Sequence, residues 1–246
     1  MNRFTFFLLI FLLLIPVGIS ANDLSGLILS GDSLFESYKY EESIEYYDNA
    51  AALDSFSAEA YWKLARSLNL FAEFQPKDEQ LELYEKASKA AEKTITIDSL
   101  LSEGHFEYAR DIGKIALFKG IFSSIGLAKK VKKEAEITLK LNPEHDGAYH
   151  MLGRWHREVA KKSIIIRAPL GLGEADKKKG LALLAKAIEL KPDLVHHRLE
   201  YGISLLDSGY KKEAYEQFEI CLDLPAPGPL DIKYQKQAKE YLAKQK

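Results

Sequence analysis

The sequence predicts an all-α protein built as an array of helix pairs. Its 246 residues are 47% hydrophobic and 28% charged with a net charge of −2, which is typical of a folded chain and excludes a disordered one. Apolar residues recur at helical spacing, as at Tyr40, Ile44, Tyr47 and Ala51, whereas strand-like alternation is scarce. Five segments also end alike, which indicates an internal repeat.

The repeat is most visible at its ends, where a helical pattern stops at a turn. These ends lie at residues 52–55, 96–99, 140–143, 189–192 and 222–225. Between them, a first segment carries a large, a small and then a bulky residue, and a second segment carries a small residue followed by an aromatic one. This is the tetratricopeptide pattern, in which each copy forms two helices. Because one pair cannot bury its apolar face, we expect about five pairs to stack into a right-handed helical-repeat array.

Small residues recur at one position of each first helix, where they allow the two helices of a copy to approach closely. They are Gly31, Ala65, Ala109, Gly153 and Gly202. Copies two, three and four exceed the 34-residue period by about 10, 10 and 15 residues, and each insert falls between the two helices of its copy. We expect the inserts to lengthen helices or to form loops. The segment after Pro229 is predicted to be a capping helix.

Residues 113–160 carry motifs that resemble a known family. These motifs are Gly113-Lys114, Leu127-Ala128, Leu141-Asn142-Pro143 and the stretch from His150-Met151-Leu152-Gly153-Arg154-Trp155 to Glu158-Val159-Ala160. They resemble the tetratricopeptide domain of the regulator of microtubule dynamics family, with similarity over roughly residues 35–243. The resemblance implies an interaction domain without catalytic activity. Eukaryotic relatives are associated with membranes, microtubules or organelle contacts, and lipid binding occurs in the family. The present chain looks like a bacterial exported relative.

The N-terminal segment has the layout of a secretory signal peptide. Arg3 supplies a positive start, residues 4–15 are almost wholly apolar, and small residues surround a cut site near Ser20 or Ala21. An apolar run of about 12 residues is short for a membrane span, which needs about 20. We therefore expect a signal peptide at 1–21, a tetratricopeptide-repeat domain at 22–246, and export to the periplasm or the exterior. An uncleaved anchor is the alternative.

Catalytic and metal-binding motifs are absent from the sequence. The six histidines form no His-Glu-x-x-His motif and have no cysteine companion, because Cys221 is the single cysteine. The sequence also contains no nucleophile elbow and no phosphate loop. We therefore expect no catalytic residue, no metal site and no cofactor. The balanced charge argues against nucleic acid as a partner.

Arginine recurs at one position of the first helices, which line the concave face of such an array. Arg66, Arg110 and Arg154 occupy this position in three successive copies. Forked guanidinium donors suit a carboxylate or phosphate, and neighbouring rings suit the apolar parts of a ligand. The sequence thus predicts a groove that binds a peptide or protein, with ion pairing to nearby glutamates as the structural alternative. The groove is completed by Trp62, Phe106, His150 and Arg157.

The inserts of copies three and four combine apolar and basic residues. They include Phe118, Phe122, Lys129, Lys130, Ile164, Ile165, Ile166 and Arg167. Such residues either pack onto neighbouring helices, which we favour, or insert among lipid headgroups while the basic groups meet anionic lipid. The overall prediction is a non-enzymatic exported scaffold for a protein or peptide. The alternative is a lipid-binding or membrane-tethering module that recognises anionic headgroups.

Overall fold

The chain is all-α in the part that the structure describes. The computed structural model describes residues 21–119 and 121–244, with the backbone alone at 21, 22 and 121–123, so the predicted signal peptide up to residue 20 lies outside it. The described helices are α1 (Ala21–Glu36), α2 (Tyr40–Leu53), α3 (Ala58–Ala72), α4 (Lys77–Ile97), α5 (Ser102–Phe118), α6 (Ile121–Leu141), α7 (Asp146–Ala160), α8 (Ile164–Arg167), α9 (Lys177–Leu190), α10 (Val195–Asp207), α11 (Lys211–Asp223) and α12 (Pro229–Ala243). None of them is long and apolar enough to cross a membrane.

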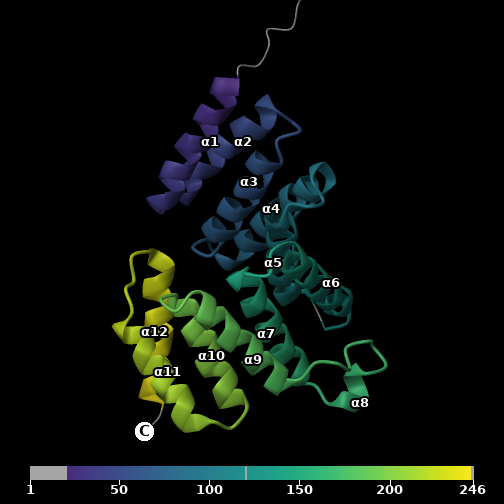
Figure 1. The fold of residues 1–246 in the computed structure, drawn as a ribbon, viewed down its shortest axis with the longest axis vertical. Helices are drawn as coiled ribbons and strands as arrows, with labels where there is room; N and C mark the ends of the chain where they lie inside the picture. Colours follow the sequence, from purple (N-terminus) through teal and green to yellow (C-terminus); the bar gives the residue numbers. More distant parts are fainter. Residues whose placement is uncertain (1–20, 120, 245–246) are drawn as a thin grey trace, which may run out of the picture.

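The helices stack as five successive pairs, which confirms the predicted fold class. The pairs are α1 with α2, α3 with α4, α5 with α6, α7 with α9, and α10 with α11, and α12 packs on the last pair. The first helices α3, α5, α7 and α10 also contact one another in sequence, so they form an inner layer. The stack curves, so that α12 lies on the same side of the molecule as α1 and α8 projects on the other side (Figure 1).

In the first, fourth and fifth pairs, a glycine of the first helix lies against a large residue of the second. A methyl group on Gly31 would stand 2.6 Å from Cε1 of Tyr47, and one on Gly202 would stand 2.5 Å from Cε1 of Phe218. Both rings are fully buried. Interiors are packed to crystal-like density, so these positions have no room for a side chain. The predicted role of the small residues is thereby explained by direct ring contact.

The inserts take both of the expected forms. The second helices of copies two and three, α4 and α6, are 21 residues long, whereas α2 and α9 have 14. In copy four the insert forms the short helix α8 and its flanking turns. After this insert, Asp176 is the N-cap of α9, where its side chain accepts a hydrogen bond from the backbone N–H of Lys179. The inserts therefore leave the stacking of the pairs intact.

Trp155 anchors the centre of the main core. Its ring is buried, and its Nε1 donates a hydrogen bond of 2.7 Å to the backbone oxygen of Ala128 in the preceding pair. The ring packs in a cluster that extends from Tyr47 through Leu64 and Tyr108. A second cluster around Phe218 joins α10, α11 and α12. The described part of the array thus holds one main core cluster, a separate C-terminal cluster and two smaller clusters, which include Ile28 and Tyr84.

Gly153 offers a direct test of the close approach inside a helix pair. A methyl group there would lie 2.6 Å from Cγ of Leu184 and 2.9 Å from the carbonyl oxygen of Gly180. We expect Gly153→Ala to lower the free energy of unfolding by about 1–3 kcal/mol, because the backbone oxygen cannot move aside freely. Gly126→Ala is the matched control, since nothing lies within 4 Å of its added methyl, and it should stabilise α6 by about 0.5–1 kcal/mol. Urea denaturation measures both, and equal effects would contradict the packing argument.

Candidate ligand-binding cavity

A cavity of about 490 Å³ opens on the inner layer of first helices. Its walls come from α3, α5, α7, α10 and α12, together with α6 and the turn between α1 and α2. Apolar groups dominate the lining, among them Leu70, Val131, Met151, Trp155 and Tyr234. The basic and histidine side chains that reach it are Arg110, Lys114, His150, Arg154 and His196. A few convergent polar groups in an apolar hollow of this size are typical of a ligand site.

The N-terminal end of α12 closes this cavity against α3. Nζ of Lys233 lies 2.9 Å from Oε2 of Glu73, and the other carboxylate oxygen of Glu73 pairs with Lys114. Burial alone would raise the pKa of Glu73, but the two lysines lower it to about 2. Gly228 sits so close to Tyr38 that a methyl group would stand 2.6 Å from the ring. The predicted capping helix is therefore also a wall of the cavity.

Arg110 is only partly engaged by the protein. Its Nη2 pairs with Glu107 three residues earlier and donates a hydrogen bond of 3.3 Å to the backbone oxygen of Arg66. Its guanidinium lies 5.7 Å from the centre of the Phe106 ring. The pairing with Glu107 corresponds to the structural alternative given by the sequence, although the side chain still lines the cavity.

Arg154 differs from Arg110 although it occupies the same position in the next copy. It lines the cavity and is half-buried. In the described ranges 21–119 and 121–244, no hydrogen bond, ion pair or ring contact joins its guanidinium to another group. The carboxylates that line the cavity are engaged by other groups; they belong to Glu73, Glu158 and Asp231. The guanidinium of Arg154 is therefore available to bind an anion.

Four of the seven predicted groove residues lie at the cavity: Phe106, Arg110, His150 and Arg154. Two others, Trp62 and Arg66, do not line it. The guanidinium of Arg66 stands 3.7 Å from the centre of the Phe35 ring and 4.8 Å from that of Trp62. Phe35 of α1 covers Arg66, so this part of the predicted ladder is occupied by the protein itself.

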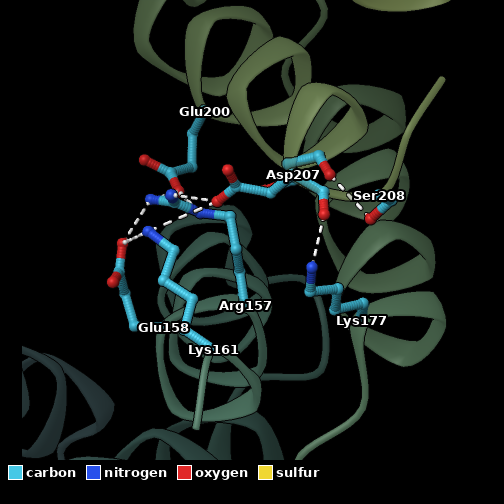
Figure 2. Close-up of polar contacts among 8 residues, drawn as sticks. Arg157, Glu158, Lys161, Lys177, Glu200, Asp207 and Ser208 are labelled. Carbon is cyan, nitrogen blue, oxygen red and sulfur yellow. Dashed lines mark hydrogen bonds and ion pairs between the residues drawn. The ribbon is translucent and has the colours of Figure 1, made fainter. Parts of the chain in front are cut away.

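Arg157 is a structural residue, which corrects the prediction that it lines the groove. Its side chain is buried and is held by three carboxylates on α7 and α10 (Figure 2). Nε donates to Glu200 at 2.9 Å, Nη1 donates to Asp207 at 2.9 Å, and Nη2 lies 2.8 Å from Glu158. Lys161 joins the same network through Glu158 and Asp207. The network ties two first helices together.

The basic-apolar insert of copy three packs onto the protein. Phe118 joins a cluster with Ala72, Tyr84 and Ile115, and its ring lies 6.1 Å from that of Tyr84. Lys130 donates a hydrogen bond to the hydroxyl of Tyr108. Lys129 is exposed, and the side chain of Phe122 lies outside the described residues.

The insert of copy four instead exposes its apolar residues. Ile164, Ile165 and Ile166 of α8 are 50%, 83% and 58% exposed. Arg167 braces the adjoining turn by donating from Nη1 to the backbone oxygens of Leu172 and Gly173 at 3.1 and 2.7 Å. These three consecutive isoleucines form an exposed apolar patch.

The structure also brings together three histidines that the sequence did not connect. His150 of α7 lies beside His196 and His197 at the start of α10, with ring centres 4.1–5.1 Å apart. Burial and the charges of the neighbouring histidines hold the pKa of His150 well below its usual range, and they lower that of His196 to about 3. The only signal in the sequence was the adjacent pair His196-His197 one copy after His150.

Two arginines three residues apart on α7 give a matched test of these assignments. Arg157→Ala leaves Glu200 buried without its partner, and we expect it to lower the free energy of unfolding by about 3–5 kcal/mol. Arg154→Ala removes no polar contact among the described residues and should change it by less than about 1 kcal/mol. Thermal and urea denaturation of both variants would measure the difference. Comparable losses would contradict the distinction between a structural and a free arginine.

Known proteins support the fold and the family. The profile of the regulator of microtubule dynamics protein 1-3 family matches residues 27–246. A comparison with curated proteins gave no significant match.

Among solved structures, the chain is similar to a thermophilic TPR protein of Thermus thermophilus, with 18% identity, TM-score 0.64 and coverage of 87% of this chain and 98% of that chain. It is also similar to pilF of Pseudomonas aeruginosa, with 13% identity, TM-score 0.54 and coverage of 91% and 88%. These likenesses concern the fold alone, whereas the profile spans nearly the whole chain: the chain belongs to the regulator of microtubule dynamics protein 1-3 family.

Proposed function

We propose that the chain is a non-enzymatic, exported tetratricopeptide scaffold that binds an acidic segment of a protein or peptide in its cavity. The observation that carries the proposal is the guanidinium of Arg154, which has no partner among the described residues and lies in a largely apolar hollow. A half-buried guanidinium at the wall of an apolar hollow can give an anion a charge-assisted hydrogen bond. A carboxylate is the natural group, because the forked donors of arginine match its two oxygens.

The rest of the cavity suits the body of such a segment. Phe106, Trp155 and Tyr234 offer aromatic surface, and Met151 offers an adaptable apolar one. The neighbouring lysine at the same edge, Lys114, is already paired with a glutamate, so the arginine carries the recognition. A volume of about 490 Å³ accommodates a few side chains and not a whole helix. The proposed ligand is therefore a short segment in which an acidic residue adjoins an aromatic or aliphatic one.

Export is part of the same proposal and is supported by the sequence. The positive start, the apolar run and the small residues near Ser20 and Ala21 favour a signal peptide at 1–21 and a mature domain at 22–246. The partner would then be met in the periplasm or outside the cell.

A peptide array tests the proposed ligand class. Short immobilised peptides that pair Asp or Glu with aromatic or aliphatic residues would be screened, and the best binder measured by calorimetry. We expect Arg154→Ala to weaken binding by about tenfold to a hundredfold, because a charge-assisted hydrogen bond is lost. Arg154→Lys should recover only part of it, since lysine lacks the fork.

Arg198 provides the matched control for this test. It is an arginine of α10 that bonds Gln217 and the backbone of Pro192, and it does not line the cavity. Arg198→Ala should bind the peptide like the unmodified protein. Peptides that bind Arg154→Ala with unchanged affinity would show that the cavity arginine is not the anchor.

A second function, membrane contact, is favoured by the exposed isoleucines of α8. Ile165 is the most exposed of them, and Lys161 and Lys162 precede the helix while Arg167 ends it. Apolar side chains beside basic groups suit the interface of an anionic membrane. Phe118 of the copy-three insert is packed onto the protein, so the apolar part of the contact would rest on α8.

Vesicle sedimentation distinguishes this function from a purely protein-binding one. Vesicles of phosphatidylcholine with and without phosphatidylglycerol would be mixed with the protein. If α8 contacts membranes, the protein should sediment with the anionic vesicles, and Ile165→Glu should abolish the effect because a charge cannot enter the interface. Ile232→Glu is the control, since Ile232 is 60% exposed on α12, far from α8 in the sequence. Absence of binding by the unmodified protein would eliminate the second function.

A further inference from the structure

Three imidazoles converge where α7 meets the start of α10. His150, His196 and His197 each offer one ring nitrogen, and these nitrogens all lie within 4.8 Å of one another. Nitrogens that share a tetrahedral zinc ion lie about 3.3 Å apart, because the Zn–N distance is about 2.0–2.1 Å. The pair His150 Nδ1 and His197 Nδ1, at 3.0 Å, is already near that separation. The nitrogen of His196 lies within 4.8 Å of the other two, and this ring would move toward them to share one ion.

The hydrogen bonds of His197 orient it as a ligand. Its side chain is fully buried, and its Nε2 donates to Oδ2 of Asp146 at 2.9 Å. A carboxylate only accepts, so Nε2 carries a hydrogen, and Nδ1 is the nitrogen that faces His150. In the metal-free protein the two Nδ1 atoms are joined by a hydrogen bond, whose hydrogen a metal ion would displace. A carboxylate on the far nitrogen of a histidine is the usual outer support of a metal ligand, since it fixes the tautomer and the ring plane.

One side of the histidine cluster faces the cavity. His150 and His196 both line it, whereas His197 lies behind them. A metal held by the three rings would therefore keep one position facing the hollow, as sites with three protein ligands do. Imidazole nitrogen favours zinc and its transition-metal neighbours over magnesium and calcium, which prefer oxygen.

We propose that His150, His196 and His197 form a zinc site, with Asp146 as its outer support and a water molecule in the fourth position facing the cavity. This departs from the expectation of no metal site, which rested on motif spacing along the chain. The site goes beyond the proposed peptide binding and does not depend on it. It draws on ring geometry, on the Asp146 hydrogen bond and on the opening to the cavity, none of which involves Arg154.

Zinc titration of the metal-free protein tests the proposal. Competition with a chromophoric chelator should give one Zn²⁺ per chain, and native mass spectrometry should give the same stoichiometry. Cobalt substitution should produce the visible absorption of a four-coordinate ion. We expect His196→Gln to weaken zinc binding by at least about tenfold, and Asp146→Asn, which keeps all three ligands, by about tenfold to a hundredfold.

Three further variants keep the result interpretable. His145→Asn alters a neighbouring histidine that caps α7 outside the cluster and retains a capping side chain, so zinc affinity should be unchanged. His150→Gln replaces His196→Gln if circular dichroism shows that the latter is unfolded. Arg154→Ala should weaken peptide binding and keep zinc binding, which separates failure of this proposal from failure of the proposed function. Absence of stoichiometric zinc, or equal affinity in His196→Gln and the unmodified protein, would overturn the site.

Discussion

The close approach of the two helices in each copy is the constraint on which the structure depends. Gly31 admits the ring of Tyr47, Gly202 admits the ring of Phe218, and Gly153 admits a buried leucine of α9. In these three copies, a residue without a side chain lets a large buried group sit directly on the helix backbone, and alanine takes the same position in copies two and three. Once each pair is fixed in this way, its outer faces can bury area only against the next pair, and the stack follows. The long α4 and α6 extend the pairs without changing this contact.

The curvature of the stack produces the cavity. Because the first helices form the inner layer, their exposed faces turn toward one another along the concave side. The return of α12 then brings Lys233 to Glu73, which lies 160 residues earlier in the chain. Lys114 pairs with the same carboxylate, and these three charged side chains form one edge of the cavity. An open groove thereby becomes a cavity in which Arg154 has no partner among the described residues.

Arginines at the same repeat position have different roles because their neighbours differ. Arg66 is stacked on Phe35, and Arg110 pairs with Glu107, whereas the arginine at the same repeat position of the next copy is left for a ligand. Arg157, only three residues further along α7, is instead held by carboxylates of α10 (Figure 2). The charge of a side chain is thus a poor guide to its role, whereas the distance to the nearest carboxylate decides it.

The sequence by itself determined the helix pairs, the small positions, the places of the inserts and the inner face that holds Arg110 and His150. These follow from periodicity, which depends on residues three and four apart. Only the tertiary structure decided which side chains are free. Two of the three carboxylate partners of Arg157 lie 43 and 50 residues away, and Asp146 meets His197 across 51 residues. Such meetings depend on a small rotation added at every pair, which local spacing does not encode. That accumulated rotation fixed the cavity, the salt-bridge network and the histidine cluster.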